Sequence, residues 1–214
     1  MNAVLQPMLQ ARQPLQQRSR DRFEQVLKAA DALLAERGLA GFSIPELAAR
    51  LGYTRASIYK FFPTPYAVLN ELAQRYLKLL EDDLVGFAAE LSRQSWIEVG
   101  NTVVNRATAF YEAHPVARLL ILGGPLTDDG YRAQELTIQR LGTLLRQLSQ
   151  QRGILLPREP VDVATQAVEI GTGCFRQSYF RHGRITDAYR KEAAYAMLAY
   201  LSRYVGDEAA RPRS

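Results

Sequence analysis

The sequence predicts an all-α fold, in which an N-terminal three-helix helix-turn-helix domain precedes a larger helical domain. Three observations lead to this expectation. Apolar residues recur at the three- and four-residue spacing of amphipathic helices through most of the 214 residues. Glycines and prolines interrupt this pattern at separate points, as expected between helices. No segment shows the convincing apolar and polar alternation of a half-buried strand.

The N-terminal end is expected to begin with an arm and a first helix. Residues 1–18 are rich in Gln, contain two prolines and lack a sustained apolar period, which predicts a flexible arm. From Ser19 onward, apolar residues follow helical spacing as far as Gly38. Glycine commonly ends a helix, so we expect the first amphipathic helix to stop there.

Two short helices are expected next, around a tight turn. Ser43 and Glu46 have the spacing of a capping box, which predicts the start of a helix. Gly52 suits a sharp turn because it tolerates positive φ, and Thr54 can cap the following helix. That helix is expected over residues 55–61. Two helices joined in this way form a helix-turn-helix motif.

The remainder of the chain is predicted to be helical. Pro63 and Pro65 mark the exit from the motif, and a long helix is expected from about Tyr66 to Leu80. Further helices are predicted at 96–113, 115–122, 129–151, 161–182 and 186–205. The expected division is an arm over 1–18, a helix-turn-helix domain over 19–65 with its motif at about 43–62, an effector-binding and dimerisation domain over 66–206, and a flexible tail over 207–214.

The positive charge of the chain is confined to its N-terminal end. Residues 1–80 carry 11 Lys and Arg against 6 Asp and Glu, whereas residues 81–214 carry 16 of each. A basic segment on a neutral body indicates a polyanionic partner bound by one end of the molecule. Charge alone is explained equally well by a solvated basic surface.

A helix-turn-helix binds duplex DNA by placing its second helix in the major groove. Arg55 can donate two hydrogen bonds to a guanine and Ala56 can contact a thymine methyl group, while Tyr59, Lys60 and Ser43 suit phosphate contacts. The predicted DNA-binding residues are Ser43, Thr54, Arg55, Ala56, Ser57, Tyr59 and Lys60.

Each of these residues also has a purely structural explanation. Tyr59 is equally suited to pack on the first helix, Ser43 and Thr54 are good caps in any protein, and Arg55 and Lys60 suit a solvated face. The motif together with the localised charge favours DNA binding.

Residues 20–80 resemble the N-terminal domain of TetR-family transcriptional regulators. The resemblance rests on AERGLAGFS followed by IPELAARLGYTRASIYKFFPTPYAVL. It implies an all-helical homodimer, a C-terminal domain that binds a small-molecule effector, and repression at a palindromic operator that the effector relieves. It also implies the DNA-contacting set given above. Pro65 departs from the family, which often has a phosphate-binding Lys there, so Arg12, Arg18, Arg20 or Lys60 would have to replace that contact.

A stripe of small residues is the candidate dimer contact. Five of them follow a 3,4,3,4 spacing, which allows another helix to approach closely, and two larger residues of the last helix can interleave nearby. The resemblance places a dimer bundle in these two helices, although the spacing alone slightly favours packing within one chain. The candidates are Ala164, Ala167, Gly171, Cys174, Ser178, Met197 and Leu201.

Aromatic residues with a few polar neighbours form a candidate ligand site between the two ends of the chain. The same residues at helical spacing are more typical of a core, and Arg118 would suit an anionic ligand. The candidates are Trp96, Phe110, Tyr111, His114, Arg118, Tyr131 and Glu135.

Several classes of protein are not expected. No apolar stretch approaches the roughly 18 residues of a membrane span, and the first residues lack a secretory signal, so we expect a cytoplasmic protein. One cysteine and two histidines offer neither an intramolecular disulfide nor a metal site, and no cofactor is expected. No catalytic or nucleotide-binding motif is present, so an enzyme is not expected. Two alternatives stay open: an all-helical small-molecule binding module without specific DNA binding, and a non-specific DNA-binding protein.

Overall fold

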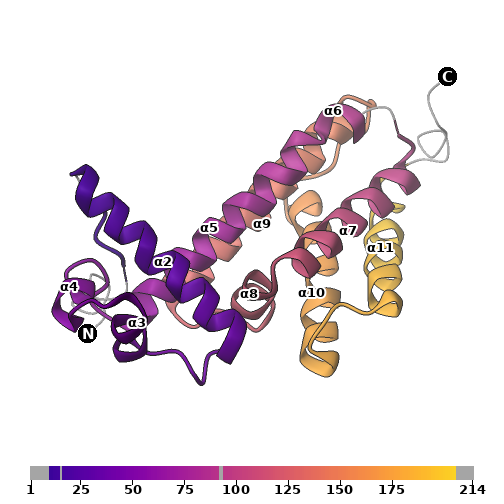
Figure 1. The fold of residues 1–214 in the computed structure, drawn as a ribbon. Helices are drawn as coiled ribbons and strands as arrows, with labels where there is room; N and C mark the ends of the chain where they lie inside the picture. The colour runs from indigo at the N-terminus through magenta and orange to yellow at the C-terminus, as the bar shows by residue number, and fades with distance from the viewer. Residues whose placement is uncertain (1–9, 15, 92–93, 206–214) are drawn as a thin grey trace. The chain divides into compact units, whose positions relative to one another are not determined.

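The computed structural model describes residues 10–14, 16–91 and 94–205, and within these residues it contains helices and loops but no strand (Figure 1). The predicted all-α fold is therefore confirmed. The helices are α2 (Gln17–Arg37), α3 (Ile44–Leu51), α4 (Arg55–Tyr59), α5 (Pro65–Gly86), α6 (Ala88–Leu91), α7 (Trp96–Ala113), α8 (Pro115–Ala117), the π-helix η1 (Arg118–Leu122), α9 (Asp128–Gln150), α10 (Val163–His182) and α11 (Asp187–Leu201). Residues 1–9 of the predicted arm and the predicted tail 207–214 lie outside the described residues.

The structure shifts several predicted helix ends. Helix α4 ends at Tyr59, two residues earlier than predicted, and the N–H groups of Phe61 and Phe62 both bond to the carbonyl oxygen of Ile58 in a closing turn. The following Pro63 explains the early end, because proline disfavours helical geometry in the residue before it. Helix α5 continues past Leu80 to Gly86, and α6 was not predicted because four residues carry too little periodic signal.

The chain forms two compact units. Of the described residues, the first contains those up to residue 76 and residues 115–133, and the second contains those from 77 to 114 and from 134 to 205. The expected boundary between residues 65 and 66 follows the prolines, but Pro65 is the first residue of α5, where proline fits the start of a helix. Among the described residues, every helix is too short or too polar to span a bilayer.

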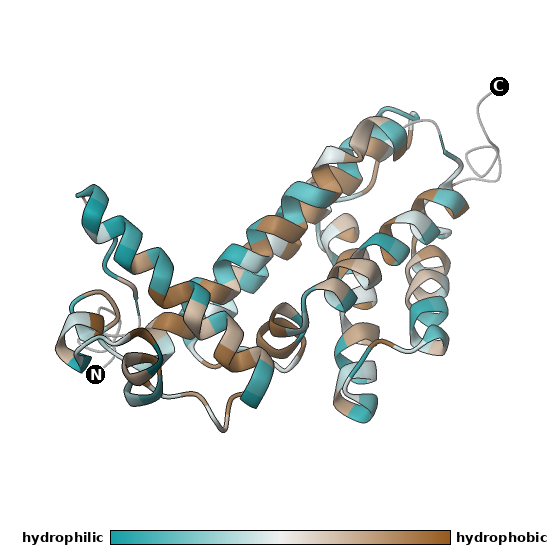
Figure 2. Ribbon diagram, viewed as in Figure 1, coloured by the Kyte–Doolittle hydropathy of each residue, from teal (hydrophilic) through white to brown (hydrophobic). Residues whose placement is uncertain are grey.

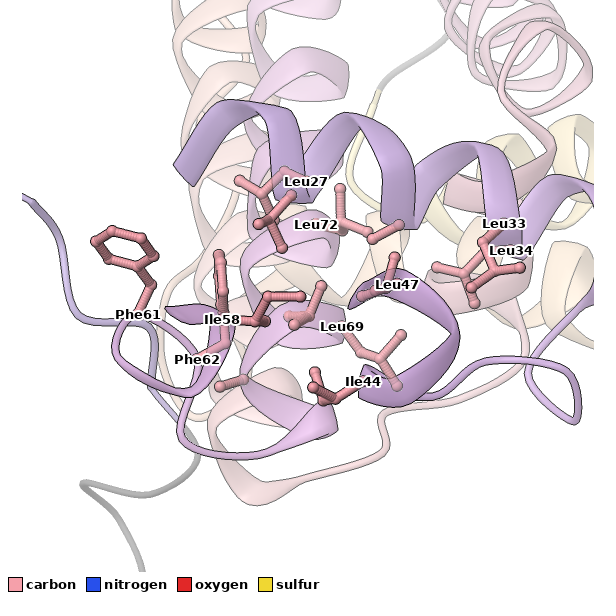
Figure 3. Packing of buried hydrophobic residues seen from close by; sticks show 14 of the residues in the cluster. Leu27, Leu33, Leu34, Ile44, Leu47, Ile58, Phe61, Phe62, Leu69 and Leu72 are labelled. Carbon is pink, nitrogen blue, oxygen red and sulfur yellow. The ribbon is translucent and has the colours of Figure 1, made fainter. Parts of the chain in front are cut away.

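The core of the first unit lies between α2, α3, α4 and the first half of α5, where most of the labelled side chains in Figure 3 point toward one another. Ile44, Leu47, Ile58 and Phe62 are fully buried. The ring of Phe62 stacks on Phe23 of α2, with 4.6 Å between the ring centroids. Burial of each such side chain contributes about 1.5–3 kcal/mol. These contacts hold the short helices of the motif against α2.

Helix α2 becomes amphipathic only beyond its first turns. Its first turns are hydrophilic, and apolar positions begin further along the helix (Figure 2). Phe23 is the first buried residue of α2. The basic residues Arg18, Arg20 and Arg22 at its beginning are therefore exposed.

The second unit is built around α11, which packs against both α10 and α7. Its core contains apolar residues of α7, α9, α10 and α11. Gly142 of α9 allows a close approach to α10, because a Cβ at this position would lie 2.7 Å from the Cα atom of Thr165. Only a residue without a side chain fits a contact between two helix backbones at this distance.

We expect Gly142→Ala to destabilise the second unit. The added methyl group meets backbone atoms that cannot move independently, and such overpacking typically costs about 1–3 kcal/mol. The midpoint of thermal unfolding should fall by about 2–4 °C for each kcal/mol. Gly86→Ala is the matched control, because a Cβ there would meet no atom within 4 Å. Equal midpoints for the two variants in calorimetry would contradict the tight helix crossing.

Candidate nucleic-acid interface and an apolar cavity

Both helices of the motif begin with a side-chain cap. The Ser43 Oγ accepts a hydrogen bond from the N–H of Glu46 at 3.3 Å, and the Thr54 Oγ1 accepts one from the N–H of Ser57 at 3.3 Å. The Ser57 hydroxyl in turn donates to the carbonyl oxygen of Thr54 at 2.7 Å. Between the helices, Gly52 has φ of 66° in the left-handed region. Caps and turn therefore determine the course of the backbone through the motif.

The predicted capping box at α3 forms only in part. The Glu46 carboxylate is 2.6 Å from the guanidinium of Arg37 at the end of α2, and this ion pair takes the place of the expected return contact to Ser43. The complete arrangement occurs instead at α7, where the N–H of Ser95 donates to Glu98 Oε2 at 2.7 Å. The difference arises because α2 brings a cation within reach of Glu46, which no local pattern reveals.

Six of the seven predicted DNA-binding residues lie on α4 or at its ends, and Ser43 caps α3. Thr54, Arg55, Ala56 and Lys60 are exposed, while Ser43 and Ser57 are half-buried. Tyr59 is 41% exposed, so part of its side chain is accessible to a partner and the rest is covered by the protein. The buried Ile58 directs the rest of α4 outward.

The charges of the motif fall into two groups. Arg50 forms two hydrogen bonds to the carboxylate of Glu36, and these bonds lower the pKa of that carboxyl group. Arg37 and Arg75 are likewise paired with acidic side chains. Within the described residues, neither Arg55 nor Lys60 forms an ion pair. Their charges are therefore available to an anionic partner.

Part of the predicted flexible arm contacts the motif. The N–H of Arg12 donates to the carbonyl oxygen of Phe61 at 2.7 Å, just beyond α4. The Gln13 side chain donates to Glu71 of α5 at 3.1 Å. The Arg12 side chain is exposed. The backbone bond therefore brings an additional cation to the end of the recognition helix.

The fold and these contacts agree with the sequence profile of one family. Residues 26–72 match the profile described as bacterial regulatory proteins, tetR family, and this match contains the whole motif. The N-terminal domain of this chain is therefore of the TetR-family type. The protein is a DNA-binding regulator of transcription, and the matched helix-turn-helix domain is its DNA-binding element. The resemblance expected from residues 20–80 is confirmed.

Solved structures of TetR-family proteins share the fold over most of the chain. SmeT, the repressor of the Stenotrophomonas maltophilia multidrug efflux pump SmeDEF, is 21% identical with a TM-score of 0.62, covering 89% of this chain and 94% of SmeT. Thermus thermophilus FadR, a transcriptional repressor seen with lauroyl-CoA, is 18% identical with a TM-score of 0.62, covering 89% of this chain and 99% of FadR. A Mesorhizobium loti protein has a TM-score of 0.65 at 18% identity, covering 88% and 99%. No curated protein matches the sequence.

The second unit contains an apolar cavity of about 100 Å³ that is partly open to solvent. Residues from the second half of α5 and from α7, α9, α10 and α11 line it. Trp96 and Tyr111, two of the seven predicted ligand-binding residues, belong to its wall. The cavity is therefore the candidate effector site of this unit.

The other five predicted ligand-binding residues do not line the cavity. Phe110 is buried and packs beside Tyr111 and His114, with ring centroids 5.6 and 4.6 Å away. Glu135 is half-buried on α9. Arg118 and Tyr131 belong to the first unit, and Tyr131 is exposed. The structure thus does not bring the seven residues together, because aromatic composition does not reveal which side of a helix faces the cavity.

The predicted dimer stripe is largely packed within the chain. Ala164 and Ala167 are fully buried in the core of the second unit, and Gly171, Met197 and Leu201 line the cavity. These five side chains pack within the chain, as the alternative explanation of the stripe expected, and their part in a dimer contact stays a prediction. The small residue at Gly171 allows α11 to approach α10 closely, because a Cβ on Gly171 would lie 2.4 Å from the Met197 sulfur atom.

The remaining two stripe residues also have internal roles or partial burial. The Ser178 hydroxyl donates to the carbonyl oxygen of Arg184 and accepts from the N–H of Thr186, both at 2.9 Å, which fixes the turn between α10 and α11. Cys174 is half-buried, and burial together with the charge of Glu192 raises the pKa of its thiol. A raised pKa disfavours the reactive thiolate.

Sequence reasoning missed most of the cavity wall. Val99, Val104 and Ala107 of α7 line the cavity, and so do Leu145 of α9 and Phe175 of α10. Their helical spacing was visible, but it is the same spacing that core residues have. No signal in the sequence separates the two environments.

We expect Arg12→Ala to weaken DNA binding about equally for all sequences. Loss of one phosphate contact should reduce the slope of log affinity against log salt by about 1. Titrations of labelled DNA at several salt concentrations measure this slope. Arg140→Ala is the control, because it removes the same charge from α9 in the second unit. If the two variants have the same slope as the unaltered protein, Arg12 makes no phosphate contact.

Proposed function

We propose that this protein is a transcriptional repressor that binds a palindromic operator as a homodimer and is released by a small-molecule effector. The observation that carries the proposal is the outward face of α4, which presents Arg55 and Lys60 without ion pairs among the described residues on a firmly packed helix-turn-helix. A protein that acts on DNA would work in the cytoplasm, as the sequence led us to expect.

Base readout would depend on the N-terminal end of α4. Arg55 suits a bidentate contact to guanine, and Ala56 suits a thymine methyl group. Tyr59, Lys60 and the α3 cap Ser43 would contact phosphates and set the register without reading sequence. Because Pro65 replaces the Lys common in the family, Arg12 would supply a substitute phosphate contact from beside Phe61.

Dimer formation would use the outer sides of α10 and α11. Phe180 is 85% exposed and Tyr195 is 70% exposed, which is unusual for large aromatic side chains. TetR-family regulators act as dimers. One five-residue recognition helix touches few base pairs, so a two-fold pair of helices on a palindrome would provide useful specificity.

Release from DNA would depend on the cavity of the second unit. TetR-family regulators bind small molecules, and FadR has been observed with lauroyl-CoA. An effector can shift the protein away from the operator only if it binds the non-binding conformation more tightly. Its binding would change the spacing or angle between the two recognition helices of the dimer, which a fixed operator does not tolerate.

We expect Arg55→Ala to lose about 1–3 kcal/mol of binding to the selected operator, with relaxed specificity at one position of each half-site. The operator is first obtained by selecting bound fragments from random DNA, where a palindrome is the expected result. Arg50→Ala is the matched control, because it removes the same charge from the same motif at an arginine already paired with Glu36.

Three outcomes would contradict the proposed function or the proposed role of Arg55. Unchanged operator binding by Arg55→Ala would remove this residue from base readout. Affinity that depends only on salt and not on sequence would favour a non-specific DNA-binding protein. Effector binding without any selected palindrome would favour a helical ligand-binding module.

We expect Phe180→Glu to dissociate the dimer. A charge placed in a desolvated aromatic contact is costly, so the dimer dissociation constant should rise at least tenfold. Analytical ultracentrifugation at micromolar concentration measures the change. Leu155→Glu is the control, since Leu155 is an exposed apolar residue outside α10 and α11. A Phe180→Glu protein that remains dimeric would exclude this part of α10 from the interface.

A further inference from the structure

The composition of the cavity wall restricts the effector. Within the described residues, the lining residues are aliphatic, aromatic or glycine, with one methionine and one threonine, and none carries a charge. The Thr172 hydroxyl already donates to the carbonyl oxygen of Val168 at 3.0 Å. Moving an ion out of water into such a wall is strongly unfavourable without a partner of opposite charge. The wall is therefore suited to an uncharged molecule.

The charged side chains near the wall do not line the cavity. The guanidinium of Arg152 lies 5.4 Å from the centroid of the Trp96 ring, and it donates hydrogen bonds to the carbonyl oxygens of Leu91, Gln94 and Leu148. The positive charge of Arg176 acts on Tyr111, but its guanidinium is paired with the carboxylate of Glu169 on the same helix. Neither residue lines the cavity. Because the charges of Arg176 and Glu169 neutralise each other, this ion pair offers no net charge to an incoming ligand.

Two residues of the cavity wall carry a polar group that can donate a hydrogen bond to a ligand. The Trp96 Nε1 is buried and has no hydrogen-bond acceptor among the described residues. Tyr111 is also buried, and burial raises its pKa against the opposing effect of the Arg176 charge, so its hydroxyl keeps its proton at neutral pH. Both groups can donate a hydrogen bond, and the Trp96 N–H is a buried donor without an acceptor among the described residues, which is unfavourable. An oxygen atom on the ligand would satisfy one of them.

The volume of the cavity limits how large a group it can hold. The cavity measures about 100 Å³, somewhat less than the roughly 150 Å³ of an engineered apolar cavity that holds benzene. The part of a ligand that lies inside the cavity is therefore limited to about one ring. Met197, which borders the cavity at Gly171, is the wall residue best able to adjust, because its side chain is unbranched and flexible.

We propose that the effector is an uncharged, largely apolar molecule of about one ring that carries a hydrogen-bond-accepting oxygen and binds in the cavity lined by Trp96 and Tyr111. This inference rests on the proposed function, in which a ligand of the second unit controls DNA binding. It excludes carboxylates and ammonium compounds as effectors at this site.

Three probe molecules that share a benzene ring test whether the cavity requires an uncharged ligand. Benzyl alcohol is neutral, benzoate is an anion and benzylammonium is a cation. Trp96 is the only tryptophan of the chain, so its indole N–H signal and its fluorescence report directly on the cavity wall. Benzyl alcohol should shift the indole signal in a saturable way, and the two ions should bind at least tenfold more weakly. Tighter binding of either ion, or no saturable shift with benzyl alcohol, would overturn the proposal.

Two substitutions test whether the probe binds in this cavity and contacts the Tyr111 hydroxyl. Tyr111→Phe removes only the hydroxyl, so it should weaken benzyl alcohol binding about fivefold and leave toluene binding unchanged. Ala107→Leu should fill the cavity and reduce binding of both probes at least tenfold, whereas Ala113→Leu makes the same change at an exposed position of α7. Undiminished binding by folded Ala107→Leu would exclude this cavity. If that variant does not fold, the Tyr111→Phe comparison still decides, because an equal loss for both probes, or none, contradicts the oxygen contact.

These measurements contain no DNA, so they are independent of the operator selection. A palindrome obtained by selection together with tight benzoate binding would overturn the effector class and leave the repressor proposal standing. Benzyl alcohol binding without any selected palindrome would contradict the repressor proposal instead.

Discussion

The burial of Ile58 and Phe62 against α2 is the constraint on which the DNA-binding end depends. Helix α4 has five residues, far fewer than an isolated helix needs to be stable in water. Its position therefore comes from packing. Ile58 and Phe62 are fully buried, and Phe62 stacks on Phe23 at a centroid distance of 4.6 Å. A helix held from one side in this way leaves its opposite side free for a partner.

The distribution of charge in the first unit follows from the same packing. Arg37, Arg50 and Arg75 lie where neighbouring helices bring acidic side chains within reach, and their ion pairs connect α2 to α3 and α5. Arg55 lies on the outward side of α4, and within the described residues it forms no ion pair. The arginines of this unit therefore fall into two groups. Those in ion pairs stabilise the motif, and those that face outward can contact phosphates or base edges.

The second unit combines close helix contacts with an unfilled space. Gly142 brings the backbones of α9 and α10 together, and Gly171 brings Met197 of α11 against α10. The same helices leave about 100 Å³ unoccupied among larger side chains. Voids in a core normally reduce stability because the lining atoms lose contacts. A void lined by Trp96 and Tyr111, beside contacts that are otherwise tight, is consistent with a site that a ligand completes.

Sequence by itself determined the all-α fold, most helix positions and the helix-turn-helix, because helical spacing, caps and turn glycines are local signals. The full range of α7, the caps Ser43 and Thr54, and the turn at Gly52 were predictable for this reason. Only the tertiary structure decided that Glu46 pairs with Arg37, that Ala164 and Ala167 pack inside the chain, and that Val104 and Met197 face a cavity. Periodicity identifies the apolar side of a helix, but it contains no information about what lies opposite that side.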